Sequence, residues 1–559
     1  MMIVSVLLAS CARQKELKVQ PFSVLSGGES MNEATDAVIK AGETFDSFEM
    51  AEAAQIVSVA DNGVVFDDYS AAKQNTKILT RLIRKAKKNT CLTFDGGALY
   101  LAASNRGCLP VIGKTGLYLK GNGTRLINVS YTAVDGKTAD RYNDSLFVPV
   151  INSHNITLDG FEFDYDNRTD AEGTIIRQTD EKTYVRLFDE YAFGAKKWVI
   201  GGEYVFAASI FDGDTVAPDE YYYPGDADSF VEMTGDGEIA VPRCPGNVGQ
   251  NIALRFSSGT YTCVLMPVQN TSGLTVRNVT VRSCPSAIVY APCGNADFCF
   301  ENFGVKPYDG SEALYASNVD CIHIKGLRGR LVLRNCDFVG IGDDALNVHS
   351  RAAAVSSVSD NTVTLLDGFE EHKLDGAWAT VGDVCAFYDK DCRLLGNAPV
   401  TAIRGNKYSF EVLPDGVGTD TFVQNTAWAP LTLIENCHVE RSRARGFLLQ
   451  TKNAVVKDCR FDNIRLSAVL ISPDFRYWYE SGFCDNVLVE NCAFDKCGSG
   501  LGDRGFGVIT ASACHDKPVP IAGKPHGNIT AANNTFTDCA EPWKMYGVTN
   551  FTEDNNTVN

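Results

Sequence analysis

The stretches LIENCHV (433–439) and VVKDCRF (455–461) decide the fold, because both are copies of one phrase. In each, two apolar residues and one charged residue are followed by Asn or Asp, then by Cys, and two positions after the Cys by Val or Phe. Their cysteines lie 22 residues apart. A sequence repeat of this length indicates a solenoid, in which each unit buries its apolar face against the next. Looser copies of the phrase occur at TVRNVTV (275–281), VLRNCDF (332–338), LVENCAF (488–494) and TAANNTF (530–536).

Short apolar runs between these phrases, such as LVLRN (331–335) and AVLIS (468–472), have the length and composition of short strands. A period near 22 residues with three short strands per turn is typical of a right-handed parallel β-helix. Its coils stack at the strand spacing, about 4.8 Å. We therefore predict an all-β protein, and the longer intervals between phrases correspond to one period plus an insertion.

The β-helix is expected to be capped and interrupted. A helix with an apolar face, which predicts an N-terminal helical cap, is indicated by Ile78, Leu79, Leu82, Ile83 and Ala86. Asp67 and Asp68 precede it as helix-capping residues. Strand-turn-strand patterns in 167–262 and 351–430 predict two inserted β-barrel or sandwich domains. The β-helix itself is assigned to residues 46–166, 263–350 and 431–559.

The composition favours a folded protein and excludes one class of partner. The 559 residues are 45% hydrophobic and 21% charged, which is ordinary for folded proteins. The net charge of −18 repels polyphosphate backbones, so no nucleic-acid partner is expected.

The N-terminus resembles a bacterial lipoprotein signal. Residues 3–9 are apolar and lead into Leu8-Ala9-Ser10-Cys11, which is similar to a lipobox. This predicts a signal over 1–11, lipidation of Cys11, a polar tether over 12–45, and a location at the bacterial cell envelope. The membrane would be contacted only through the lipid anchor. The alternative is a chance match in an apolar N-terminus that lacks the usual basic residues.

The nineteen cysteines invite a disulfide framework, but their setting favours free thiols. Four of them, Cys336, Cys437, Cys459 and Cys492, occupy the same place in the repeat, where a small apolar side chain suits an interior stack. Paired CxxC motifs with zinc-ligand spacing are absent from the sequence, so no metal site is predicted.

Three carboxylates are expected to meet on neighbouring coils. When the apolar runs of NVDCIHI (318–324) and GDDALNV (342–348) are aligned, Asp320 stacks on Asp344 and Asp343 lies beside it. Aligning the cysteines of later coils continues the column with Arg445 and then Ser467. Because neighbouring carboxylates repel, at least one should have a raised pKa, as a general acid requires. The others could hold a water, and this division of labour is the one that glycoside hydrolysis needs.

These motifs resemble glycoside hydrolases. NVD followed one coil later by GDDA is similar to the aspartate triad of the polygalacturonases of glycoside hydrolase family 28, and more closely to the β-helix exo-galactosidases of family 110. The Gly-His-Gly and Arg-x-Lys coils of family 28 are not found here. The inserted domains, the lipobox and the spacing of 23 residues between Asp320 and Asp343 are similar to family 110.

The resemblance implies an inverting exo-α-galactosidase that acts on terminal α-1,3-linked galactose, as in blood group B or linear Gal-α-1,3-Gal glycans. It implies Asp343 as general acid, Asp320 and Asp344 as general bases, and neither a metal nor an organic cofactor. The expected partner is an oligosaccharide or glycoconjugate with terminal α-galactose, and a homodimer is compatible with the sequence.

Substrate contacts are predicted for Arg445, His349, Tyr477 and Trp478. Arg445 could instead only neutralise the carboxylates, and His349, like His323, could be an interior histidine. The aromatic segment 472–483 suits the apolar face of galactose, or else covers an insertion.

Three alternatives stay open from the sequence. Carboxylates on adjacent coils could bind calcium, although Arg445 in the same column opposes a cation. A polygalacturonase-like hydrolase or lyase on acidic polysaccharide would need a basic groove, which suits an acidic chain poorly. A noncatalytic glycan-binding lipoprotein would tolerate loss of the aspartates.

Overall fold

The computed structural model describes residues 31–559 except for 103–105, 130–145, 167–169, 189–204, 214, 223–230, 236, 257–263, 293, 368–371, 374–377, 476–477 and 514–520. Cys11 and Tyr477 lie outside the described residues. None of the described helices is both long enough and apolar enough to cross a membrane.

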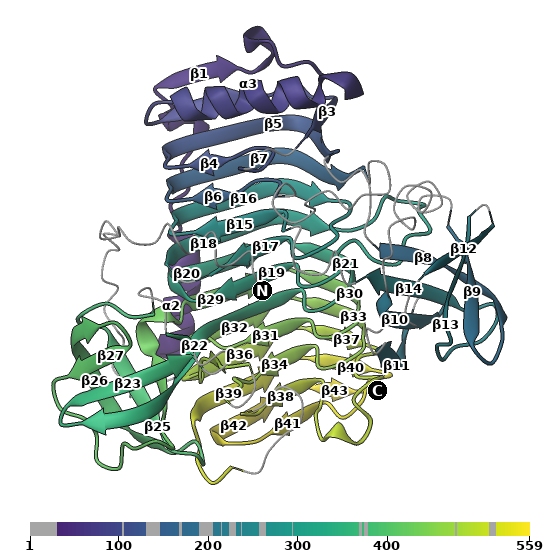
Figure 1. Cartoon of the computed structure of the whole chain (residues 1–559). Coiled ribbons are helices and arrows are strands. Elements are labelled where there is room, and N and C mark those ends of the chain that lie inside the picture. Colours follow the sequence, from purple (N-terminus) through teal and green to yellow (C-terminus); the bar gives the residue numbers. More distant parts are fainter. Residues whose placement is uncertain are drawn as a thin grey trace.

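The chain winds into a parallel β-helix whose coils stack from the N-terminal helix α3 to the C-terminus, which confirms the predicted fold class (Figure 1). Its strands form three parallel ladders. The first ladder contains β1 (Gln55–Ser58), β2 (Thr90–Thr93), β5 (Thr115–Asn128), β7 (His154–Tyr165), β16 (Ser272–Val281), β18 (Asn295–Val305), β20 (Leu327–Arg334), β29 (Leu431–Glu435), β32 (Asn453–Lys457), β36 (Asn486–Glu490), β39 (His526–Ala532) and β42 (Val548–Asp554).

The long strands β5, β7, β16 and β18 continue into the second ladder. Its further members are β3 (Ala98–Leu101), β21 (Asp337–Ile341), β30 (His438–Ser442), β33 (Arg460–Ile464), β37 (Ala493–Asp495), β40 (Thr535–Thr537) and β43 (Thr557–Val558). The third ladder contains β4 (Val111–Ile112), β6 (Val150–Ile151), β15 (Met266–Gln269), β17 (Val289–Ala291), β19 (Ile322–Lys325), β22 (Leu346–Ser359), β31 (Phe447–Leu449), β34 (Val469–Ile471), β38 (Ile509–Ala511) and β41 (Trp543–Met545).

The repeated phrase builds the turn between the first two ladders. Its Asn or Asp has a left-handed backbone, with φ of 51° at Asn436, 56° at Asp458 and 52° at Asn491. Asn and Asp tolerate this conformation better than other residues that carry a Cβ. Their side chains also bond from coil to coil, as where Asn491 Nδ2 donates to Asp458 Oδ1 at 2.5 Å. The backbone of the turn therefore favours Asn or Asp at this position of the phrase.

The interior of the β-helix is filled by side chains from successive coils. The cysteines that follow the turn residues are buried free thiols at Cys336, Cys437, Cys459 and Cys492. The aromatic positions of the phrase form a stack of Phe461, Phe494 and Phe536, with ring centroids 4.9 and 4.8 Å apart. Vertical stacking of like residues is what gives the sequence its repeat.

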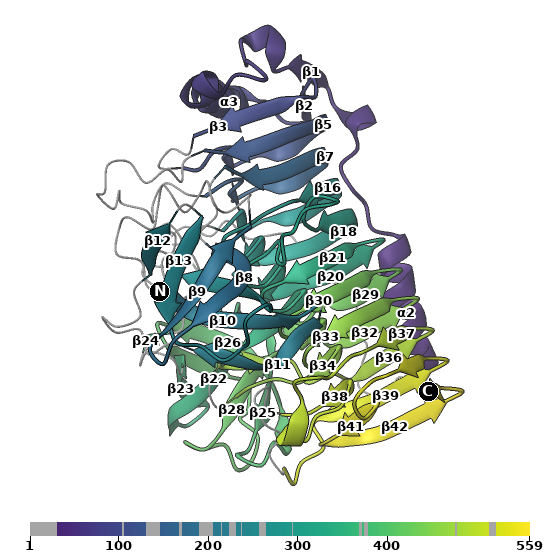
Figure 2. The same ribbon diagram turned by 90° about the vertical axis from the view of Figure 1, so that its right-hand side faces the viewer.

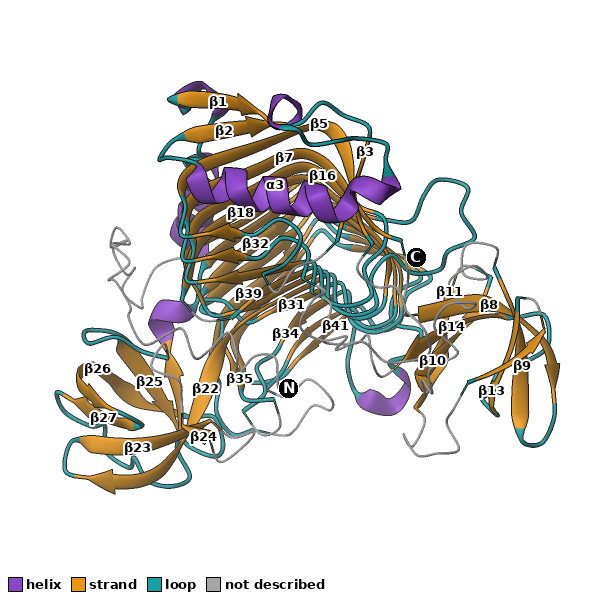
Figure 3. Ribbon diagram, turned by 45° about the horizontal axis from the view of Figure 1, so that its top comes forward, coloured by secondary structure: helices purple, strands orange, loops and turns teal. Residues whose placement is uncertain are grey.

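Within the described residues, helices α3 and α2 cover parts of the β-helix. Helix α3 (Ala72–Lys85) lies across the N-terminal end and buries Ile78, Leu79 and Ile83 against the core (Figure 3). Asp68 caps the short 3-10 helix η3 (Tyr69–Ala71) that leads into α3, accepting a bond from the Ser70 amide.

Helix α2 (Met31–Glu43) packs along the side of β29, β32 and β36 (Figure 2). The prediction of a tether over 12–45 is wrong for these residues. Ala34, Val38 and Ala41 form a narrow apolar stripe, and Val38 packs against Leu433 and Val455.

The first insertion is one antiparallel sheet, whose strands run in the order β11, β10, β14, β8, β9, β13, β12. They are β8 (Asp170–Gln178), β9 (Lys182–Leu187), β10 (Val205–Asp212), β11 (Thr215–Tyr222), β12 (Glu232–Gly235), β13 (Glu238–Pro242) and β14 (Asn251–Phe256). Its core includes Ala313, Leu314 and Tyr315 of the β-helix, so the sheet is packed against the solenoid.

The second insertion is a small antiparallel barrel on another side of the β-helix (Figure 3). Strand β22 leaves the third ladder and pairs with β23 and β28, and the circle closes through β27, β26 and β25. Its own strands are β23 (Thr362–Asp367), β24 (His372–Lys373), β25 (Val384–Tyr388), β26 (Leu394–Arg404), β27 (Lys407–Phe410) and β28 (Phe422–Asn425). Because β22 begins two residues after Asp344, the barrel is joined to the coil that carries Asp343 and Asp344.

Candidate active site

Asp320, Asp343 and Asp344 lie in the turns that lead into β19 and β22. The ladder pairs Ile322 with Leu346, and this register places Asp320 beside Asp344 on the next coil. Pairing of Leu346 with Phe447 places Arg445 on the coil after that. The predicted column is confirmed, and the Asp344 amide donates a hydrogen bond to Asp320 Oδ1 at 3.0 Å. One carboxylate oxygen from each aspartate lies within 4.8 Å of the others.

The glycines before the aspartates allow this close stacking. A Cβ on Gly342 would lie 2.4 Å from the carbonyl oxygen of Asn318 on the preceding coil, so no larger residue fits there. Gly340 has a positive φ of 71°, which glycine adopts without strain. The sequence GIGDD is therefore needed to bring the two turns together.

The aspartates differ in their exposure to solvent. The Asp344 side chain is 3% exposed, whereas that of Asp320 is 14% and that of Asp343 is 28% exposed. A molecule in solution can reach Asp343 most easily and Asp320 next. Asp344 lies beneath them.

Each member of the GDD pair has its own arginine. Arg443 donates from Nη2 to Asp343 Oδ1 at 2.8 Å, and the Arg443 side chain is itself buried. Arg445 lies 3.3 Å from Asp344 Oδ2 through Nη1, and its amide donates to Asp344 Oδ1 at 3.0 Å. The structure therefore places Arg445 as the partner of a buried carboxylate.

Burial raises the pKa of both Asp343 and Asp344. For Asp344 the pKa rises to about 7, because desolvation and the neighbouring charges of Asp343 and Asp320 outweigh the attraction of Arg445. For Asp343, burial and Asp320 raise the pKa, and the guanidinium of Arg443 opposes them most strongly. Since the two groups interact, a proton near neutral pH belongs to the pair.

Sequence reasoning missed two arginines that act on Asp343. The cysteine alignment that placed Arg445 also places Arg443, but only the structure pairs it with Asp343. Arg255 comes from β14 of the first insertion, and its charge also lowers the pKa of Asp343. No pattern in the sequence could place Arg255, because the sheet that carries it interrupts the repeat.

The residues predicted to contact the substrate differ in their exposure to solvent. The substrate contact of His349 stays a prediction, and the structure shows its side chain completely buried with Nδ1 2.7 Å from the Ser350 carbonyl oxygen. Trp478 is 42% exposed and lies two residues before Glu480. Glu480 in turn lies 3.4 Å from His349.

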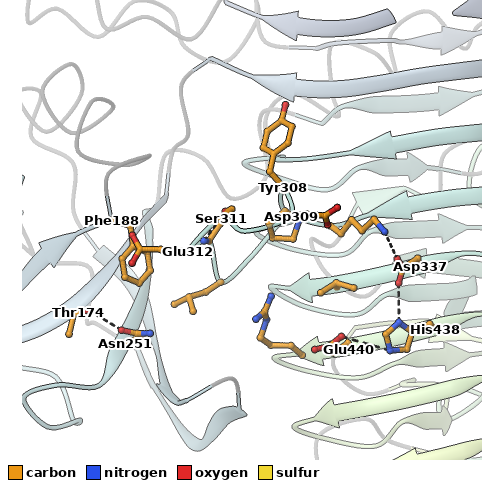
Figure 4. Close-up of a pocket in the computed structure, with 16 residues that line it drawn as sticks. Thr174, Phe188, Asn251, Tyr308, Asp309, Ser311, Glu312, Asp337, His438 and Glu440 are labelled. Atoms are coloured by element: carbon orange, nitrogen blue, oxygen red, sulfur yellow. Dashed lines mark hydrogen bonds and ion pairs between the residues drawn. The ribbon is translucent and has the colours of Figure 1, made fainter. Parts of the chain in front are cut away.

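A cavity of about 530 Å3 lies between the first insertion and the β-helix (Figure 4). It is lined from one side by Thr174 and Asn251 and from the other by Asp337, His438 and Glu440, and none of the three aspartates lines it. We therefore treat it as separate from the carboxylate cluster.

No family model matches the chain. Several curated proteins are nevertheless similar to it. An α-1,3-galactosidase B of Bacteroides thetaiotaomicron is 24% identical over 442 residues, covering 74% of this chain and 70% of that protein. An α-1,3-galactosidase A of Shewanella woodyi is 25% identical over 65% of this chain and 63% of its own length. An α-1,3-galactosidase A of Akkermansia muciniphila is 24% identical over 70% and 66%. The expected resemblance to glycoside hydrolase family 110 is confirmed at this level of similarity.

Solved structures with similar folds include an endo-xylogalacturonan hydrolase from Aspergillus tubingensis, with a TM-score of 0.41 and 9% identity over 90% of this chain and 92% of that one. An exopolygalacturonase from Thermotoga maritima has a TM-score of 0.37 and 10% identity, over 95% and 96% of the two chains. These scores are too low to carry an argument about function.

Proposed function

We propose that this chain is a glycoside hydrolase of the galactosidase type, and more narrowly an inverting exo-α-galactosidase that removes terminal α-1,3-linked galactose. The observation that carries the proposal is the cluster of Asp320, Asp343 and Asp344, with oxygens within 4.8 Å on adjacent coils. Similarity to proteins named α-1,3-galactosidase supports the substrate class. Blood group B and linear Gal-α-1,3-Gal ends are the proposed substrates.

Asp343 is proposed as the general acid. It is the most exposed of the three carboxyl groups, and burial raises its pKa, so it can carry a proton to the glycosidic oxygen of a bound substrate. As the bond to the sugar breaks, that proton moves to the leaving oxygen and Asp343 becomes a carboxylate. Arg443, already 2.8 Å away, then stabilises the negative charge.

Asp320 and Asp344 are proposed to hold and deprotonate the attacking water. They are linked by the bond from the Asp344 amide to Asp320 Oδ1, so their carboxyl groups are held at a fixed separation. Arg445 favours the ionised form of Asp344 through its guanidinium and its amide. A carboxylate acceptor is what a general base must provide.

The proposal of an inverting mechanism rests on the family resemblance and not on the distance between the carboxyl groups. Inverting glycosidases usually separate their carboxyl groups by about 6.5–9.5 Å, and retaining ones by about 5–5.5 Å. Each of the three aspartates has one oxygen within 4.8 Å of an oxygen of the others, and this closest approach of single oxygens is a different quantity from the separation of the carboxyl groups. A third carboxylate changes the geometry, because two acidic groups can share one water while the third faces the leaving oxygen.

An NMR time course on a Gal-α-1,3-Gal disaccharide tests both parts of the proposal. The expected first product is free β-galactose, with kcat lowered about 10²–10⁴-fold in Asp343→Asn. Release of α-galactose first would replace inversion by retention. Binding without hydrolysis of any α-galactoside, equally strong in all three Asp→Asn variants, would support a glycan-binding protein and refute the enzyme.

We also propose that Cys11 carries a lipid and anchors the protein in the cell envelope. The support is the sequence Leu8-Ala9-Ser10-Cys11 after an apolar run. Labelling of cells with a radioactive fatty acid should mark the wild-type protein and not Cys11→Ser. Label on both forms, or on neither, would refute this anchor.

A further inference from the structure

Behind Asp320, two histidines and a glutamate from three different strands converge. His323 lies on β19, His349 on β22, and Glu480 on β35 (Glu480–Ser481), which pairs antiparallel with Ser350 and Arg351 of β22. His323 Nε2 is 3.0 Å from His349 Nε2, and His349 Nε2 is 3.4 Å from Glu480 Oε1. One atom from each residue lies within 4.8 Å of the other two.

The Nδ1 atom of each histidine ring already has a hydrogen-bond partner. His323 Nδ1 lies 2.6 Å from Asp320 Oδ2, and His349 Nδ1 lies 2.7 Å from the Ser350 carbonyl oxygen. A carbonyl oxygen can only accept, so the contact at His349 Nδ1 is a hydrogen bond when that nitrogen carries the proton. The Asp320 oxygen can accept in the same way from a protonated His323 Nδ1. Glu480 Oε2 accepts a hydrogen bond from Gln450 Nε2 at 2.9 Å, which fixes the carboxylate.

This arrangement leaves two nitrogen lone pairs facing each other. With both Nδ1 atoms protonated, each neutral ring presents an unprotonated Nε2, and two such atoms at 3.0 Å repel unless a cation lies between them. That cation is either one shared proton or a metal ion. Metal-bound histidines characteristically donate their other N–H to a carboxylate or a backbone carbonyl, and both histidines do so here.

The spacing suits a small divalent ion. Zn²⁺ takes His nitrogens at about 2.0–2.1 Å and carboxylate oxygens at about 2.0–2.2 Å, so ligands at tetrahedral corners are about 3.3–3.5 Å apart. The two measured separations are 3.0 and 3.4 Å. Two imidazoles and one carboxylate also match the ligands that first-row transition metals prefer, whereas Ca²⁺ and Mg²⁺ prefer oxygen only.

Burial and charge also fit a bound cation. His349 and Glu480 are buried, and the His323 side chain is 20% exposed, which leaves the cluster reachable from one side. Glu480 supplies one negative charge, and Asp320 behind His323 supplies a second. Among the described residues, Lys325 is a positive group whose charge acts on both His323 and Glu480.

We propose that His323, His349 and Glu480 bind one first-row divalent metal ion, with Zn²⁺ the best match, and that this ion holds His323 and thereby the carboxylate of Asp320 in place. The first part stands on the ligand geometry alone. The second part rests on the proposed function, since it assigns the metal a positioning role toward a catalytic aspartate. This site could not be predicted from the sequence, because its ligands follow no short spacing motif.

The binding test uses the full chain without a histidine tag, stripped with a chelator and then titrated with Zn²⁺ or Co²⁺. We expect about one ion per chain, a Co²⁺ absorption spectrum typical of tetrahedral N/O ligands, and a higher melting temperature with Zn²⁺. His323→Gln and Glu480→Gln should lose the tight site. Asp320→Asn, which keeps all three ligands, should weaken binding about 10–100-fold.

The matched control is His438→Gln, because His438 also lies between acidic side chains but faces the other cavity. It should bind one ion as the wild type does. If the folded wild type takes up no Zn²⁺ and shows no Co²⁺ spectrum, a shared proton lies between the histidines and the metal site is refuted. Equal uptake by wild type, His323→Gln and Glu480→Gln would also refute it. If the stripped chain cannot fold, metal content of the protein as purified, compared between wild type and Glu480→Gln, decides the same question.

Activity then separates the two parts of the proposal. If metal removal lowers kcat on Gal-α-1,3-Gal and Zn²⁺ restores it, the positioning role is supported. If the site binds metal but removal leaves kcat unchanged, the positioning role is refuted while the site stands. A chain that hydrolyses no galactoside would refute the proposed function, and the binding measurements would still decide the metal site.

Discussion

Replacing Arg443 by Met should move the alkaline limb of the pH–rate profile to higher pH. In the proposed mechanism the alkaline limb of kcat/KM reports loss of the proton that Asp343 and Asp344 share in the free enzyme, which Asp343 delivers to the substrate. Arg443 lies 2.8 Å from Asp343, and its charge is the strongest of the effects that lower the pKa of that carboxyl group. Methionine keeps much of the side-chain length and removes the charge.

The size of the shift follows from the geometry. Two unit charges 2.8 Å apart attract by about 6 kcal/mol at an effective dielectric constant near 20. The Asp343 side chain is 28% exposed, so water replaces part of this attraction once the guanidinium is gone. An arginine neighbour typically lowers the pKa of an aspartate by about 1–3 units. Because burial and Asp320 both raise the pKa, its removal should move the limb upward by about that amount.

The assay is release of galactose from a Gal-α-1,3-Gal disaccharide, followed from acidic to alkaline pH for wild type and Arg443→Met. Arg186→Met is the control, because Arg186 forms an exposed pair with Glu238 in the first insertion, and such pairs contribute little. Its profile should match the wild type. A folded, active Arg443→Met enzyme whose alkaline limb stays in place or moves to lower pH would refute the reasoning about Asp343.

Three further predictions concern the β-helix. Phe494→Ala removes the middle ring of the stack with Phe461 and Phe536, so the free energy of unfolding should fall by about 3–5 kcal/mol in urea denaturation, and a loss below about 1 kcal/mol would contradict the packing. His438 has its pKa raised to about 9 by bonds to two aspartates, so its stabilising contribution is fully present below about pH 6.5 and is lost as the pH rises through 9. The melting temperature of wild type should therefore fall more between pH 6 and 10 than that of His438→Gln, and parallel curves would contradict this. Among the described cysteines Cys539 is the least buried, so a thiol reagent should label it before the others in the folded protein. Mass spectrometry can follow the labelling, and earlier labelling of one of the buried cysteines would contradict its burial inside the β-helix.

Much of the coil stack could be predicted from the sequence because a parallel β-helix repeats at each turn. Residues that stack in space, such as the cysteines of successive coils, recur at a fixed interval in the chain. Once two apolar runs are aligned, the register follows, and that was enough to place Asp320 beside Asp344 and Arg445 on the next coil. The same periodicity gave no account of why Asn or Asp precedes the cysteine, because the left-handed turn is a property of the folded backbone.

The position of α2 and the partners of the aspartates depend on contacts outside the sequence repeat. The docking of α2 joins residues about 400 positions apart through a narrow stripe of small side chains. Arg255 reaches the site from an inserted sheet, and Glu480 reaches His349 from an extended coil. What the sequence by itself determined is the periodic stack and the three aspartates within it. Only the tertiary structure decided their arginine partners and the histidine cluster behind them, because side chains from non-periodic segments meet only after those segments fold onto the β-helix.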